Sequence, residues 1–297
     1  MAQKLIKLKG NTYYIDSAVN IGVVSNDRSE AIIIDTGLDD DMGRKILRFL
    51  REEGLTPVAI INTHSHADHC GGNNFITKRF DIPIYATGFE KAVIENPLLE
   101  PFYLYSAYPL KEMQNKFLMA KESKAEGILK EGETEIEGIP LQIMSLKGHS
   151  PGMIGVATED NVLFTGDAYF PKRILDKYAL SFYTDIKNTL DTLKYLKTLE
   201  YDFFVPGHGE VLEDINPTVD TNITQINEIV TIITEFCSEA KSREDVASYI
   251  INHYNIRLNV TQYYLTLSTI AAYLSYLTDD GSLKIIVADN NIKWVKV

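Results

Sequence analysis

Short apolar runs alternate with turn-rich segments through the first two thirds of the chain. Runs rich in β-branched residues predict strands at residues 13–15, 18–24, 31–34 and 58–62. Three later runs, residues 141–146, 162–164 and 203–205, have the same character. Apolar residues at helical spacing predict helices over about 39–53 and 187–200. Strands in two groups with helices outside them favour an α+β sandwich.

The pattern changes after about residue 215, where helical periodicity takes over. Helices are predicted over about 218–240, from a cap at Ser242, and over about 259–277. Residues 283–287 and 292–297 then predict a β-hairpin. Three helices followed by a hairpin resemble a winged helix. We therefore expect two domains, residues 1–215 and a small winged-helix-like domain at 216–297.

Residues 95–126 follow neither periodicity. The stretch 97–109 has three prolines and four aromatic residues, which is poor helix material and costly to expose. This stretch and residues 169–183 could fold over a site as pocket walls, or could form a satellite cluster or an oligomer contact. Lys172 and Arg173 could bind an anionic substrate group, although such a pair is commonly just solvated.

The densest candidate chemistry follows the predicted strand at 58–62. His64, His66, Asp68 and His69 lie within six positions of a chain that has only six histidines. Side chains two residues apart on an extended loop can point to the same side and share one ion. Imidazole and carboxylate are expected ligands of zinc and similar divalent ions. A loop that merely caps a helix would need one such residue and not four.

Three more potential ligands follow later strands, each next to a glycine. They are His149 after Gly148, Asp167 after Gly166, and His208 after Gly207. Glycine lets the backbone turn sharply and approach an ion closely. Taken singly, each of the three is more typical of a turn residue than of a ligand. Together with the first cluster they predict one composite metal site.

In this order, the series resembles the metallo-β-lactamase superfamily, whose hydrolases share an αββα sandwich. The resemblance covers about residues 1–215. It implies two divalent metal ions, with zinc expected and iron or manganese as alternatives. It further implies a first metal held by His64, His66 and His149, a second held by Asp68, His69 and His208, and a bridging Asp167.

Four further assignments accompany this resemblance. Because Asp167 occupies the bridging position and no cysteine is among the ligands, the site looks more like that of glyoxalase II than that of antibiotic-degrading enzymes with a cysteine ligand. Cys70 is expected to be a small buried filler. Asp35 matches a structural position near the metals in the family, but it could equally be a strand-end turn. His253 lacks spaced partners and is expected to be a surface or packing residue.

Two ions close together can hold a bridging hydroxide at neutral pH and polarise the attacked group. Asp68 is expected to orient that hydroxide and is therefore the predicted catalytic residue. We expect a metal-dependent hydrolase acting on a small ester, thioester or lactone. The alternative is an endoribonuclease or phosphodiesterase using the same ions. A flavodiiron-type redox protein would need a flavin domain or partner, and normally prefers a carboxylate where His66 stands.

Composition agrees with a cytoplasmic enzyme. Hydrophobic residues make up 45% and charged residues 24% of the 297 positions, which is ordinary for a globular protein. No stretch is long and apolar enough to span a bilayer, and no signal peptide is recognisable. Two cysteines provide no disulfide framework, which suits a reducing compartment.

Charge argues against a nucleic-acid partner, although lactamase-like endoribonucleases have a similar C-terminal arrangement. The chain carries a formal charge of −12. Residues 216–297 contain six Lys or Arg and nine Asp or Glu, which leaves −3. Nucleic-acid affinity depends largely on neutralising phosphates. The last predicted helix has tyrosines but no Lys or Arg over 259–277, which suits packing or a homodimer surface better.

Overall fold

Two β-sheets pack face to face in the computed structural model, which describes residues 4–297. The first sheet is mixed, and its strand order follows the chain. Its seven strands are β1 (Leu5–Lys9), β2 (Thr12–Ile15), β3 (Ile21–Ser25), β4 (Glu30–Ile34), β5 (Thr56–Ile61), β6 (Ile84–Ala86) and β7 (Gly127–Ile128).

The second sheet has five strands in the order β12-β11-β10-β9-β8. Strands β11 and β12 pair in parallel, and the other neighbours pair antiparallel. The strand bounds are β8 (Gly132–Ile136), β9 (Ile139–Ser145), β10 (Ile154–Thr158), β11 (Val162–Gly166) and β12 (Phe203–Pro206). Alternate residues of the two sheets, such as Ile34 and Ile61 against Ile143 and Val156, form a buried core between them.

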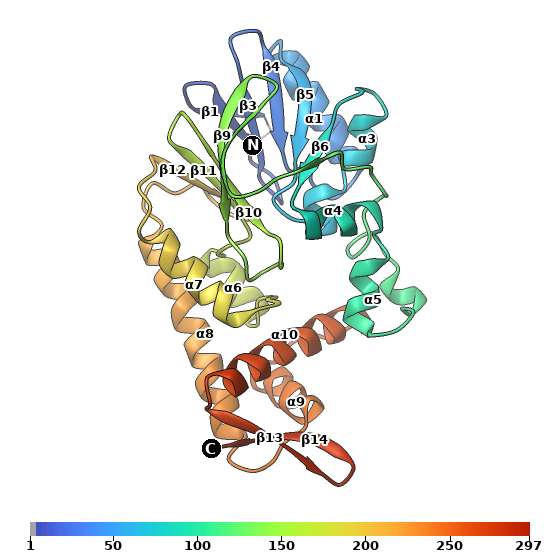
Figure 1. Ribbon diagram of the computed structural model, residues 1–297, viewed down its shortest axis with the longest axis vertical. Helices are drawn as coiled ribbons and strands as arrows, with labels where there is room; N and C mark the ends of the chain where they lie inside the picture. The colour runs from blue at the N-terminus through green and yellow to red at the C-terminus, as the bar shows by residue number, and fades with distance from the viewer. Residues whose placement is uncertain (1–3) are drawn as a thin grey trace.

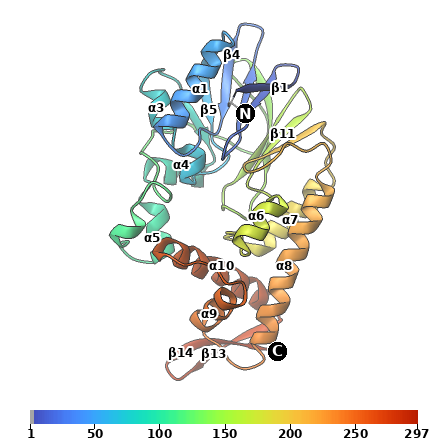
Figure 2. The same cartoon turned by 180° about the vertical axis from the view of Figure 1, so that it is seen from behind.

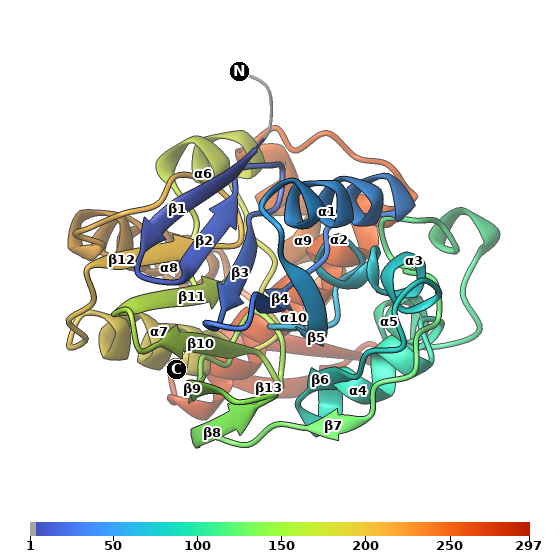
Figure 3. The same ribbon diagram turned by 90° about the horizontal axis from the view of Figure 1, so that it is seen from above.

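Helices cover the outer face of each sheet. Helix α1 (Asp40–Glu52) packs its buried Ile46 and Phe49 on the first sheet, on the side away from the second (Figure 3). Helix α7 (Ile186–Leu196) places Leu193 and Leu196 on the second sheet. Both helices begin at an aspartate whose side chain caps the first turn, Asp39 and Asp185. The predicted αββα sandwich is therefore confirmed.

The remaining elements before residue 216 are short and lie between the strands. They are α2 (Ala67–Cys70), α3 (Asn73–Thr77), α4 (Gly88–Glu95), α5 (Leu99–Tyr105), the 3₁₀ turn η1 (Lys111–Met113) and α6 (Lys172–Tyr178). Helix α5 contradicts the expectation that 97–109 would not form a helix. Pro101 is tolerated there because it lies in the first turn, where backbone N–H groups have no partner within the helix.

The C-terminal segment, residues 216–297, contains three helices and a hairpin, as predicted (Figure 1). These are α8 (Asn216–Phe236), α9 (Arg243–His253), α10 (Val260–Asp279), β13 (Leu283–Ala288) and β14 (Asn291–Lys296). Ser242 and Asp245 form a reciprocal capping box at the start of α9. Among residues 4–297, no helix has both the length and the apolar character needed to cross a bilayer.

One hydrophobic core joins this segment to the sandwich. It runs from Leu163 and Phe204 of the second sheet through Leu193 of α7 to Ile229 of α8 and Leu274 of α10. All five side chains are at most 3% exposed. The division between residues 215 and 216 stays a prediction, and the two parts share buried surface across it.

Candidate metal site

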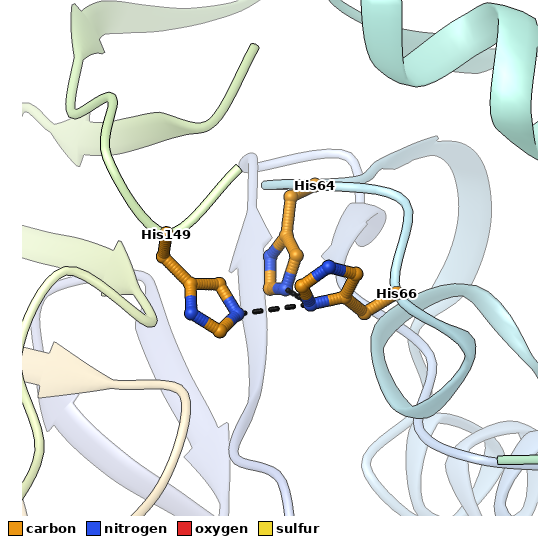
Figure 4. Close-up of side chains that lie close together, drawn as sticks. All are labelled: His64, His66 and His149. Carbon is orange, nitrogen blue, oxygen red and sulfur yellow. Dashed lines mark hydrogen bonds between the residues drawn. The ribbon is translucent and has the colours of Figure 1, made fainter. Parts of the chain in front are cut away.

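Three histidines meet where strand ends from both sheets converge. His64 and His66 lie on the loop after β5, and His149 lies on the loop after β9. The His66 Nδ1 atom is 3.0 Å from His64 Nε2 and 2.9 Å from His149 Nε2, and the three rings point at one another (Figure 4). Three nitrogen atoms at this separation could all contact a single divalent ion.

A second group of ligand-type side chains adjoins the first. Asp68 and His69 come from α2, and His208 comes from the loop after β12. The His208 Nε2 atom lies 3.4 Å from an oxygen of Asp68. These three side chains could hold a second ion.

Asp167 lies between the two groups. One carboxylate oxygen is 3.5 Å from His149 Nε2 and 3.4 Å from His208 Nε2. The other oxygen is 3.4 Å from His69 Nε2. The structure therefore brings together all seven side chains that the sequence singled out, with Asp167 between the two groups.

Glycine at residue 207 allows this close approach. A Cβ atom there would lie 2.1 Å from an Asp167 oxygen and 2.7 Å from His69 Cε1. Both distances are shorter than any normal contact, so a larger residue would displace the Asp167 carboxylate or the His69 ring. The sequence predicts that a glycine beside a late ligand permits close approach, and Gly207 beside His208 is such a case.

Each ring that faces the site with Nε2 is held at its other nitrogen. His149 Nδ1 donates to the Phe182 carbonyl at 2.8 Å, and His208 Nδ1 donates to the Ala18 carbonyl at 2.7 Å. His64 Nδ1 is 3.1 Å from the Thr63 hydroxyl. Such partners fix the ring orientation and the tautomer, which leaves Nε2 free to act as a ligand.

Asp35 holds the fourth ring. Its carboxylate is 2.8 Å from His69 Nδ1 and accepts hydrogen bonds from the Thr63 backbone at 2.8 Å and the Thr63 hydroxyl at 2.7 Å. The residue is 2% exposed and adopts a left-handed backbone conformation with φ of 62°. Of the two interpretations open for Asp35, the structure supports the structural residue near the site.

Glu90 of α4 joins the two ligand loops, and no sequence signal pointed to it. One oxygen accepts from the Ser65 backbone at 2.8 Å and the Ser65 hydroxyl at 2.6 Å. The other accepts from the Ser150 hydroxyl and from the Gly152 backbone at 2.8 Å. This fully buried carboxylate therefore ties the His64–His66 loop to the His149 loop.

The protein environment biases these groups toward particular protonation states. Burial lowers the pKa of His66 and of His149 to about 4, so both rings are neutral at pH 7. Burial opposes ionisation of Asp68, but the charges of His69 and His208 outweigh it and lower the Asp68 pKa to about 2. Neutral imidazole and ionised carboxylate are the forms that bind metals. Burial opposes protonation of His208, but the charges of Asp167 and Asp68 outweigh it and raise the His208 pKa to about 10, so a metal would displace a proton from this ring.

Two buried atoms in the site test whether the residues present fit metal ions. Neither His69 Nε2 nor the Asp167 oxygen facing it has a hydrogen-bond partner among the described residues. Both residues are at most 4% exposed. An unpaired buried polar atom is costly, and a cation between such atoms would remove that cost. The donor set of nitrogen and carboxylate oxygen suits divalent zinc, iron or manganese.

A cavity of about 300 Å³ opens onto the site. Its walls include Phe117 and Leu118 from the 95–126 stretch, and Phe170 and Phe182 from the 169–183 stretch. Both stretches contribute to the cavity walls, and the 97–109 piece also places Leu104 and Tyr105 in a satellite cluster with Tyr264. This volume falls at the lower end of the range for small-molecule sites.

The other singled-out residues lie apart from this centre. Lys172 pairs with Asp176 at 2.7 Å on the exposed side of α6, so it is a solvated surface residue. His253 is exposed at the end of α9 beside Tyr249 and Tyr254. Cys70 is 2% exposed in the core behind the site, as expected of a filler.

Known proteins are similar to this chain in sequence. A probable metallo-hydrolase from Bacillus subtilis is 27% identical over 216 residues, which is 71% of this chain and 92% of that protein. A hydroxyacylglutathione hydrolase from Haemophilus influenzae is 28% identical over 193 residues, covering 64% of this chain and 85% of its own.

The fold is also shared across the full length. A β-lactamase domain protein from Burkholderia ambifaria superposes with a TM-score of 0.76 over 99% of this chain and 93% of its own, at 16% identity. The family model described as the metallo-beta-lactamase superfamily matches residues 14–208, which include all seven ligand-type side chains. The chain therefore belongs to the metallo-β-lactamase superfamily.

Proposed function

We propose that this chain is a dinuclear metal-dependent hydrolase acting on a small ester, thioester or lactone. His64, His66 and His149 would hold one ion, Asp68, His69 and His208 the other, and Asp167 would contact both. The observation that carries the proposal is the place of Asp167, whose two oxygens lie 3.4–3.5 Å from histidines of both groups.

The ions are expected to be zinc, with iron or manganese as alternatives. When bound, two such ions lower the pKa of water and polarise the carbonyl oxygen under attack. Asp68 supports hydrolysis because its carboxylate stays ionised and can accept a hydrogen bond from the attacking water. The apolar walls of the cavity would hold the substrate and exclude bulk water around its carbonyl group.

A small-molecule substrate is favoured over a nucleic acid. The cavity is lined by Phe, Leu and Ile side chains, and its acidic lining residues are Asp68, Asp167 and Glu100, whose pKa is raised by burial. Phosphodiester backbones require several basic contacts, and the acidic balance of residues 216–297 does not provide them. We therefore place the phosphodiesterase and endoribonuclease alternative second.

Turnover assays with a substrate panel test this proposal. Purified protein would be compared on thioester, lactone, β-lactam, phosphodiester and RNA substrates, before and after chelation and after zinc is restored. We expect carbonyl substrates to be hydrolysed, chelation to abolish that activity, and zinc to restore it. Asp167→Asn should lower activity strongly, while Asp27→Asn, a matched change in an exposed turn, should not. Turnover of RNA or phosphodiesters alone would contradict the proposal.

A further inference from the structure

The cavity over the metal site is closed on its far side by the C-terminal segment. Its lining includes Gln262, Leu265, Thr266 and Thr269, all from one face of α10. Helix α10 lies outside the 14–208 range that matches the family model. The wall opposite the metal-binding side chains therefore comes from outside the matched family domain.

Contacts with α5 and the following loop hold α10 in this place. The rings of Tyr105 and Tyr264 meet edge to face, with centroids 5.1 Å apart. The Asn115 side-chain amide donates to the Thr261 hydroxyl at 3.2 Å. Both views show the start of α10 beside α5 (Figures 1 and 2).

Two polar groups on the cavity wall have no partner within the part of the chain described. Glu100 of α5 is 4% exposed, and no residue of 4–297 donates a hydrogen bond to its carboxyl. Thr266 of α10 is 2% exposed, and its hydroxyl is likewise unpaired. Buried polar groups normally have partners, and leaving them unpaired costs free energy. A bound ligand would supply those partners.

The charge of the wall restricts what that ligand can be. None of the described residues lining the cavity is a lysine or an arginine. Lys177 reaches the hydroxyl of the lining residue Tyr178 at 2.8 Å, and Lys116 is paired with Asp39 at 3.1 Å. Away from the metal-binding end of the cavity, an anionic tail would therefore meet Glu100 and apolar side chains without a cationic partner.

We infer that this cavity binds an uncharged substrate tail that carries an amide group, held between α5 and α10. The Glu100 carboxyl would accept the amide N–H, and the Thr266 hydroxyl would donate to the amide oxygen. A carboxyl oxygen can accept this bond in either protonation state. This inference rests on the proposed hydrolase function for the reacting end of the substrate. It makes Glu100 and Thr266 specificity-determining residues.

If the inference is correct, the substrate tail of this chain differs from the glutathione tail in the name of the related hydroxyacylglutathione hydrolases. A glutathione tail carries two carboxylates and an ammonium group, so it is anionic overall at neutral pH. An N-acetylcysteamine tail offers the same sulfur and an amide, but no charge. The glutathione tail is also much longer, so an N-acetylcysteine tail, which adds a single carboxylate to the N-acetylcysteamine tail, separates the effect of charge from that of length.

Binding of non-hydrolysable thioethers tests the inference without relying on turnover. Zinc-loaded full-length protein would be titrated calorimetrically with S-hexyl-N-acetylcysteamine, with its carboxylated counterpart S-hexyl-N-acetylcysteine and with S-hexylglutathione. We expect the neutral thioether to bind at least about tenfold more tightly, because the charged tail must be desolvated without a partner. The same or tighter binding of the glutathione thioether would overturn the inference, especially if Lys177→Ala then weakened it.

Variants of the two wall residues sharpen the test. Thr266→Val should weaken binding of the neutral thioether by about threefold to tenfold, the value of one hydrogen bond. Ser268→Ala, on the same helix but away from the cavity lining, should leave binding unchanged. If Thr266→Val does not fold, Glu100→Leu provides the second test with the same expectation. Unchanged binding in the folded wall variant would overturn the assignment.

Turnover of the matching acyl thioesters distinguishes a failure of this inference from a failure of the proposed hydrolase function. Preferred binding of the neutral thioether without hydrolysis of either acyl thioester would contradict the hydrolase function and leave the cavity assignment standing. Faster hydrolysis of the acylglutathione would support the hydrolase and overturn the cavity assignment.

Discussion

At the scale of single residues, the site is defined by what holds each ring as much as by the rings themselves. Backbone carbonyls of Phe182 and Ala18 and the carboxylate of Asp35 orient His149, His208 and His69. Because one nitrogen of each ring is bound to such a partner, the other nitrogen faces the remaining ligand-type side chains. Such outer contacts are expected to affect metal affinity nearly as much as the ligands do.

Replacing Asp68 separates catalysis from the first group of histidines. Asp68→Ala should abolish turnover, because it removes both a side chain of the second group and the carboxylate that orients water. His64, His66 and His149 remain, so about one ion per chain should be retained. Turnover rates and the metal-to-protein ratio from elemental analysis measure the two effects.

Asp191→Ala is a suitable control for this change. Asp191 forms only an exposed ion pair with Lys187 on α7, so its loss should alter neither turnover nor metal content. Loss of all metal from the Asp68 variant, or unchanged activity, would contradict the roles proposed for Asp68.

Acidification should destabilise the metal-free protein. Burial lowers the pKa of His66 and His149 to about 4, so between about pH 4 and 6.5 the unfolded chain binds more protons than the folded one. Stability contributed by the neutral rings is therefore present above pH 6.5 and is lost as the pH falls toward 4. Urea midpoints of chelator-treated protein at pH 6.5 and 4.5 measure this loss.

Two histidine substitutions test whether the loss of stability at low pH comes from the histidines of the metal site. In metal-free protein, His66→Gln should reduce the difference between the two urea midpoints, because one proton-linked group is removed. His253→Gln, which changes an exposed histidine on α9, should leave the difference as it is. Equal midpoints at the two pH values in the wild-type protein would show that these rings are not buried as described.

The seven ligand-type residues could be predicted because each follows a strand in a short motif with characteristic spacing. Glu90 and Glu100 could not be predicted in this way. Their positions depend on how α4 and α5 pack against loops distant in the sequence, and no local pattern encodes that packing. Asp35 was predicted only in part. The sequence allowed both a turn residue and a structural residue near the metals, because the two have the same local sequence.

At the scale of elements, α4 acts as the support of the ligand loops through Glu90. Glu90→Gln should lower the free energy of unfolding by about 2–3 kcal/mol, because bonds to a charged acceptor are weakened and one amide N–H faces other donors. Urea denaturation measures the change. Glu112→Gln, which changes an exposed glutamate of the η1 turn, is the matched control. A Glu90 variant as stable as the wild type would show that α4 does not support the loops.

Elements with a clear apolar run or period were predictable, whereas several of the shortest strands and helices were not. The periodic stripes of α1, α7 and α10 and the alternation of β13 and β14 correspond to the observed elements. Strands β1, β6 and β7 have five residues or fewer and depend on pairing with neighbours, which local sequence does not determine. Helix α5 was missed because proline content outweighed the position of Pro101 within the first turn.

At the scale of the whole molecule, the sandwich and the C-terminal segment are joined by one core. Removing residues 216–297 would uncover Leu193 of α7 and neighbouring apolar side chains that α8 and α10 now bury. The truncated chain should therefore be less soluble or change its oligomeric state. Size-exclusion chromatography and binding of a hydrophobic dye, with the full-length protein as reference, measure these effects. A well-folded, unassociated product would show that the segment is an independent attachment.

The central claim is that seven side chains surround two metal ions, and anomalous X-ray diffraction tests it most directly. Crystals of zinc-loaded protein measured on both sides of the zinc absorption edge should show two anomalous peaks. One should lie within about 2.0–2.2 Å of ligand atoms of His64, His66 and His149, and the other within that range of Asp68, His69 and His208. Asp167 should contact both. Absence of metal peaks at this place, or peaks more than about 5 Å from His149 or His208, would contradict the account.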